Sequence, residues 1–126
     1  MNVAYIDTSA LVAIAFGEAD GSALAERLEE YDEILSSNLL EAEFRSALAR
    51  ERVSDGNHIL TWIAWILPSR VLNPEIDRVL AAGYLRGADL WHLACALYVS
   101  GSPEELVFVS LDERQREVAD VLGFLR

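Results

Sequence analysis

Short apolar runs alternate with longer segments of helical periodicity along the whole chain. The apolar runs predict strands at 2–6, 33–36, 69–72 and 106–109, with a terminal edge strand at 124–125. Helices are predicted at 8–16, 22–31, 38–52, 56–67, 75–86, 89–99 and 112–122, where apolar residues recur every three or four positions. This alternation predicts an α/β domain with a mostly parallel, helix-covered sheet of four to five strands.

The segment 56–67 is unusually rich in large apolar side chains. Trp62, Trp65 and Ile66 recur at the spacing of one buried helix face. Ile63 and Leu67 widen the apolar surface beyond a single stripe. The alternative interpretation is that part of this helix packs against a second subunit or a partner protein.

The length and composition are those of one globular unit. A chain of 126 residues, 52% of them apolar, predicts a single domain over residues 1–126 with a sizeable core. The apolar runs are too short to cross a membrane. The first residues lack the basic segment of a signal peptide, and Asp7 interrupts their apolar run. We therefore expect no signal peptide and a cytoplasmic protein. The single Cys95 is expected to be a buried thiol.

The charge is strongly acidic. The formal net charge is −11, and the basic residues are all arginine. Such a balance argues against a broad basic surface for nucleic acid. It leaves room for a nucleic-acid enzyme whose clustered carboxylates bind divalent cations, because those ions reduce the local negative charge.

Two aspartates occupy matching positions after predicted strands. Asp7 directly follows the strand at 2–6, and Asp112 comes shortly after the strand at 106–109. If the strands are parallel, both lie at their carboxyl ends, where open α/β sheets bind ligands. Each could instead be an acid that caps the following helix. Asp89, at the start of the predicted helix 89–99, has the same two interpretations.

Two glutamates of the helix at 38–52 flank its buried stripe at similar angles. Glu41 has two structural explanations, since it lies at capping-box spacing from Asn38 and four residues before Arg45. Glu43 has no basic residue three or four positions away. Its carboxylate therefore needs a partner from elsewhere in the fold, and a metal ion is one possibility.

Asp7, Glu43, Asp89 and Asp112 are oxygen donors from four separate segments. Carboxylates suit hard cations such as Mg²⁺ and Mn²⁺, whereas a zinc site would require a set of cysteines and histidines that the chain lacks. Such a cluster with one or two divalent ions suits metal-assisted hydrolysis of a phosphodiester.

These four residues stand in the stretches YIDTSALV, SSNLLEAEFRSAL, LRGADLWHLACAL and LVFVSLDERQREVADVLGF. Together, in this order, the stretches resemble the PIN-domain nucleases, and within them the VapC-type toxins of toxin–antitoxin pairs. The resemblance implies a three-layer α/β/α sandwich, Mg²⁺- or Mn²⁺-dependent endoribonuclease activity on RNA, and a homodimer inhibited by a cognate antitoxin. It places the family's acidic residues on Asp7, Glu43, Asp89 and Asp112, and so selects Glu43 over Glu41.

Neighbouring polar residues have possible supporting roles. The hydroxyls of Thr8, Ser9 and Ser110 are suited to orient a ligand carboxylate or a metal-bound water, with helix capping as the alternative for Thr8 and Ser9. His92, one turn after Asp89, is expected to be packed and hydrogen-bonded rather than a general base. His58 is expected at the surface.

Three arginines lie near the predicted acidic edge. Arg86, Arg114 and Arg116 have the geometry to contact a substrate phosphate, and ordinary ion pairing with nearby acids is the alternative.

Two other functions remain to be weighed. One is a binding or assembly module that keeps the fold without the activity. The other is a phosphatase or phosphotransferase with Asp7 as nucleophile. It is disfavoured because Ser9 occupies the place of a second aspartate and no Walker-type GxxxxGK[ST] run exists.

Overall fold

A parallel sheet of four strands forms the centre of the computed structural model, which describes residues 1–126. The strands are β1 Val3–Ile6, β2 Glu33–Ser37, β3 Ile63–Ile66 and β4 Val107–Val109, in the order β3-β2-β1-β4. All three pairings are parallel, so the carboxyl ends of the strands lie at one edge. The terminal strand predicted at 124–125 is a single bridge from Leu125 to Val107.

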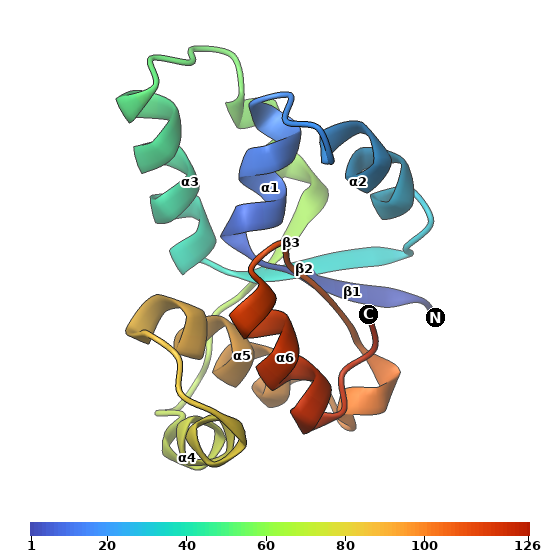
Figure 1. The fold of residues 1–126 in the computed structure, drawn as a ribbon, viewed down its shortest axis with the longest axis vertical. Helices are drawn as coiled ribbons and strands as arrows, with labels where there is room; N and C mark the ends of the chain where they lie inside the picture. The colour runs from blue at the N-terminus through green and yellow to red at the C-terminus, as the bar shows by residue number, and fades with distance from the viewer.

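Helices cover both faces of this sheet and complete a three-layer α/β/α sandwich (Figure 1). The first layer holds α1 Thr8–Ala15, α2 Gly21–Leu28 and α3 Leu39–Arg50. The second holds α4 Asn73–Ala82, α5 Gly87–Val99 and α6 Glu113–Leu122. Two 3₁₀ helices, η1 Asn57–Trp62 and η2 Pro103–Glu105, precede β3 and β4. The predicted fold class is confirmed.

The alternation of side chains along β1 explains the two cores. Ala4 and Ile6 point into the core formed with α1, α2 and α3. Tyr5 points to the opposite face, where its ring stacks on Phe108 with the centroids 5.4 Å apart. Both faces are covered, so every residue of this central strand except the first is fully buried.

The third strand is not where the sequence pattern predicted it. Residues 56–67 are not one helix, because the chain forms η1 and then the edge strand β3, which pairs with β2. The predicted strand at 69–72 is absent, and Val71 is 75% exposed. An apolar run rich in tryptophan and isoleucine has comparable helix and strand patterns, and pairing with β2 decides in favour of a strand. Trp62 and Trp65 therefore do not share a helix face.

The predicted helix at 75–86 is shifted towards the N-terminus. Helix α4 begins at Asn73, with Pro74 in its first turn, and ends at Ala82. Residues 83–86 are outside any helix, and the backbone is extended at Gly83 and Arg86. A Cβ at Gly83 would lie 2.9 Å from a methyl group of Val118, so glycine permits the close approach of this segment to α6.

None of the helices combines the length and apolar character needed to cross a membrane. Cys95 is fully buried, as predicted.

Candidate metal centre

Asp7 is the most buried of the four predicted carboxylates. It follows β1 directly, is 3% exposed, and its backbone N–H donates to the carbonyl of Val109 at the end of β4, at 3.0 Å. As the N-cap of α1, its Oδ1 accepts the backbone N–H of Ala10 at 3.3 Å. The capping role is therefore real and coexists with a position at the carboxyl edge of the sheet.

Hydroxyl groups hold both oxygens of this carboxylate. Ser9 Oγ donates to Oδ1 at 2.8 Å, and Ser110 Oγ lies 3.1 Å from Oδ2, where its single hydrogen is shared with Oε1 of Gln115. Burial raises the pKa of Asp7 to about 6, although these hydrogen bonds and the positive charge available on His92 act in the opposite direction. A carboxylate that is so poorly solvated gains strongly from a nearby cation.

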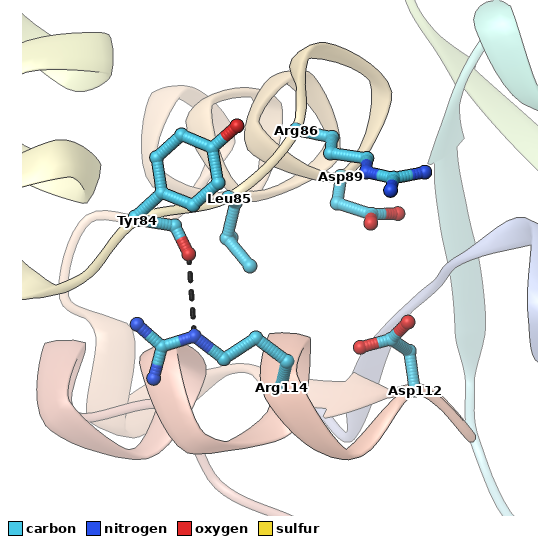
Figure 2. A pocket seen from close by; sticks show the side chains of 6 residues that line it. All are labelled: Tyr84, Leu85, Arg86, Asp89, Asp112 and Arg114. Atoms are coloured by element: carbon cyan, nitrogen blue, oxygen red, sulfur yellow. Dashed lines mark hydrogen bonds between the residues drawn. The ribbon is translucent and has the colours of Figure 1, made fainter.

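Asp89 and Asp112 face each other across a cavity of about 270 Å³ between residues 84–86 and the start of α6 (Figure 2). Asp112 caps α6, because its Oδ1 accepts the backbone N–H of Gln115 at 2.8 Å. Asp89 is not a cap: α5 starts two residues earlier, at Gly87, and Asp89 lies in the first turn. That position places its side chain near the positive end of the helix dipole.

The pKa of Asp89 responds to the charges of two of the other predicted acids. Burial raises its pKa first, and the negative charges of Asp112 and Glu43 raise it further. The charges of His92 and Arg86 oppose this shift. The negative charges of Asp112 and Glu43 therefore both act on Asp89, which places these two acids at the same edge of the sheet as Asp89.

Glu43 has partners from outside its own helix. Thr8 Oγ1 donates to its Oε1 at 2.7 Å, and His92 Nε2 lies 3.0 Å from the same oxygen. The hydrogen bond with His92 is the main reason that the pKa of Glu43 is lowered. Residues of α1 and α5 therefore supply the partners that Glu43 lacks on its own helix, and Glu43 stays ionised.

His92 is a packed, hydrogen-bonded residue, as predicted. It is 1% exposed, and its Nδ1 lies 2.7 Å from the hydroxyl of Tyr5. The backbone N–H of Ser37 donates to that hydroxyl at 3.2 Å, so the hydroxyl's own hydrogen is free for Nδ1. In the neutral ring this places the hydrogen on Nε2, which donates to Glu43. A chain of hydrogen bonds thus runs from the sheet to the acidic edge.

Gln115 is the residue that the sequence reasoning missed. It is fully buried on α6, where its Nε2 donates to the backbone carbonyl of Asp89 at 3.2 Å and its Oε1 accepts from Ser110 Oγ at 2.7 Å. Ser110 Oγ also accepts the backbone N–H of Asp112, at 3.0 Å. The spacing of the sequence could have indicated that Gln115 is buried. It lies three, four and seven residues before Val118, Ala119 and Leu122, which form the buried stripe of α6.

We expect Gln115→Leu to loosen the acidic edge without unfolding the domain. The change leaves the buried Ser110 hydroxyl without its shortest hydrogen bond and removes one donor from the Asp89 carbonyl, which costs about 1–3 kcal/mol. Because the link between Asp89 and Ser110 is lost, Mn²⁺ affinity should fall about 10- to 100-fold. Urea unfolding and calorimetric Mn²⁺ titration measure the two effects, and an unchanged Mn²⁺ affinity would contradict a positioning role.

The predicted arginines lie in different places. Arg86 and Arg114 line the cavity with Asp89 and Asp112, and Arg114 Nε donates to the carbonyl of Tyr84 at 3.3 Å (Figure 2). Arg116 lines a separate cavity beside α2 and lies 3.7 Å from Glu113.

Glu41 has one of its two predicted structural roles. Its carboxylate pairs with Arg45 at 2.8 Å on the helix surface, as expected from the spacing. The capping box is absent, because Asn38 makes no side-chain cap hydrogen bond. His58 is exposed, as predicted.

The donor chemistry of the acidic edge fits a hard divalent cation. The four side chains offer carboxylate oxygens from the N-caps of α1 and α6 and from α3 and α5, with no cysteine among them. In the present conformation no three acidic, histidine or cysteine side chains form a closed ligand group. The repulsion around Asp89 and the desolvation of Asp7 show what a cation would relieve.

The parallel three-layer fold with carboxylates at the ends of its strands defines an α/β protein with an acidic, cation-suited edge. The PIN domain family matches residues 4–121, and the chain belongs to that family. PIN domains are generally metal-dependent nucleases. No curated protein and no solved structure gave a significant match.

Proposed function

We propose that this protein is a Mg²⁺- or Mn²⁺-dependent endoribonuclease that hydrolyses RNA phosphodiester bonds, with Asp7, Glu43, Asp89 and Asp112 as metal ligands and catalytic residues. One observation carries the proposal. Asp89 and Asp112 line one cavity at the edge of the sheet where the buried Asp7 follows β1, in a chain of the PIN family.

The residues around the acidic edge have different proposed roles. A divalent ion bound there would polarise the phosphoryl oxygen and lower the pKa of a bound water. The Thr8 hydroxyl donates to the Glu43 carboxylate at 2.7 Å, and the Ser110 hydroxyl lies 3.1 Å from the Asp7 carboxylate. Their hydroxyls keep the ligand oxygens oriented. Arg114 and Arg116 are proposed to contact substrate phosphates, with Arg114 the better placed because it lines the cavity.

The proposed biological role is that of a toxin controlled by a cognate antitoxin, acting in the cytoplasm as a homodimer. It is supported by the resemblance of the four stretches around the acids to VapC-type toxins. Exposed apolar residues near β3, Trp62 at 43% and Leu67 at 68%, supply contact surface for a subunit or an antitoxin. Light scattering of the purified chain tests the dimer, and a monomer at micromolar concentration would contradict it.

Cleavage of a single-stranded RNA in the presence and absence of Mg²⁺ tests the enzymatic proposal. We expect internal cuts that require the metal and disappear with a chelator. A second possibility is a PIN-fold binding or assembly module without activity, favoured by the lack of a closed ligand group in this conformation. Calorimetric titration separates the two, because the module predicts no Mn²⁺ site at millimolar metal.

A further inference from the structure

The cavity beside Asp89 and Asp112 has a second end, away from the two carboxylates. Its wall is the extended segment 84–86, in which Leu85 is buried while Tyr84 and Arg86 are exposed. Side chains of an extended chain alternate in direction, so burial of Leu85 in the core turns its two neighbours outward. Figure 2 shows Tyr84 at one end of the cavity and the two aspartates at the other.

Tyr84 is the most exposed aromatic side chain of the protein, at 71%. No residue of the chain accepts or donates a hydrogen bond at its hydroxyl, and no aromatic ring or cation packs on its face. A tyrosine left in water beside a polar cavity presents a flat apolar surface together with a polar end. Such a surface suits a planar ring that also carries hydrogen-bonding groups.

The backbone under Tyr84 is held in place. Arg114 Nε donates to its carbonyl at 3.3 Å, and the guanidinium lies against Gly83, where a Cβ would approach Nη2 to 3.2 Å. Arg114 thereby ties the segment 83–86 to α6 across the cavity. With the backbone fixed in this way, only the rotation of the Tyr84 side chain remains to be lost when the ring binds a ligand.

The same cavity carries positive charge in an otherwise acidic protein. Arg86 makes no ion pair, and Arg114 uses two of its donors, one with Tyr84 and one with Glu117 at 3.3 Å. A guanidinium has five N–H donors, so both arginines retain donors for phosphate oxygens. The cavity therefore offers an aromatic face and free cationic donors next to the carboxylates.

We propose that this cavity is a nucleotide subsite for unpaired RNA, in which Tyr84 stacks on a base while Arg86 and Arg114 bind the adjoining phosphates. The inference rests on the proposed ribonuclease function and names the residues of this chain that would hold a nucleotide beside the acidic edge. Bases inside a duplex are stacked and paired, so they are closed to an aromatic side chain.

Fluorescence anisotropy with two labelled probes separates stacking from charge. The first probe is a short oligoadenylate, and the second is an abasic ribose-phosphate oligomer of the same length, which has the charge without the bases. All proteins carry Glu43→Gln so that cleavage does not consume the probe, and Mg²⁺ is present throughout.

We expect Tyr84→Ala to weaken oligoadenylate binding roughly 5- to 150-fold and to leave the abasic probe unaffected. Tyr84→Phe should bind like the parent, because the ring rather than the hydroxyl stacks. Arg86→Gln should weaken both probes. Arg50→Gln, at an exposed residue that lines another cavity, serves as the matched control for Arg86→Gln and should change neither.

Equal oligoadenylate affinity for Tyr84→Ala and its parent would overturn the subsite. Equal losses for both probes would overturn base stacking. If the unmodified chain cleaves RNA in the same preparation, either result leaves the ribonuclease proposal standing. A parent protein that neither binds the probes nor cleaves RNA would overturn both proposals.

Discussion

Replacement of Asp7 by asparagine is expected to abolish RNA cleavage, by more than about 100-fold, while the protein stays folded and becomes more stable near neutral pH. Asparagine keeps the shape and one acceptor oxygen for Ser9 and Ala10 but removes the buried charge. Activity falls because the neutral amide is a poor ligand for a divalent ion.

The stability gain has a defined pH dependence. Burial raises the pKa of Asp7 from 3.8 to about 6 in the folded protein. Between these values the folded state binds more protons than the unfolded state, so stability falls as the pH rises from about 4 to about 6. The buried charge lowers the free energy of unfolding of the wild-type protein by on the order of 3 kcal/mol, and this full cost applies above pH 6.

Thermal unfolding across this pH range measures the effect. The melting temperatures of the two proteins should agree at low pH, and Asp7→Asn should melt higher at pH 7. Addition of Mn²⁺ should raise the melting temperature of the wild type alone, since ligand binding to the folded state stabilises it. A wild type that is more stable than Asp7→Asn at pH 7 without metal would contradict the proposed cost of the buried carboxylate.

Glu43→Gln is the second change with a large expected effect. A glutamine oxygen still accepts from Thr8, so the local hydrogen bonds largely survive and the stability should change little. Cleavage should fall by more than about 100-fold, because the neutral amide is a poorer ligand for a divalent ion than the carboxylate. Gel assays of RNA cleavage and urea unfolding measure the two quantities.

Glu41→Gln is the matched control, two residues away on the same helix. It removes an exposed ion pair with Arg45 and should cost about 0.3–0.5 kcal/mol, since no capping box contributes. Cleavage should match the wild type. Equal loss of activity in both variants would show that general negative charge on α3, and not Glu43 itself, is what matters.

The overall architecture was predictable because strand and helix periodicities alternate clearly through most of the chain. The positions of Asp7 and Asp112 followed from one rule, that parallel strands present their carboxyl ends at one edge. The sequence therefore placed both residues correctly relative to the sheet without showing their contacts.

The third strand was mispredicted because its pattern is ambiguous. In β3 only Ile63 and Ile66 are buried, three residues apart, which is also a helical spacing. The deciding interaction is the ladder with β2, and a local pattern does not contain it. The same limit applies to α4, whose end is set by the approach of Gly83 to α6.

Contacts between distant segments account for what the sequence missed at the candidate site. Glu43 was singled out because it lacked local partners, but its actual partners are Thr8 and His92, which are 35 and 49 residues away. Gln115 gained its role only when α5 and α6 came together at Asp89. Periodicity identifies a buried polar residue, and tertiary structure identifies what it binds.

A crystal structure of the protein grown with Mn²⁺, with anomalous scattering recorded, tests the metal centre most directly. We predict an anomalous peak at the acidic edge, with carboxylate oxygens of Asp7, Glu43, Asp89 and Asp112 drawn around it directly or through bound water. The same density should be absent from Asp7→Asn. A crystal grown at saturating Mn²⁺ that shows no peak at this edge, or a peak that none of these carboxylates contacts, would contradict the proposed metal centre.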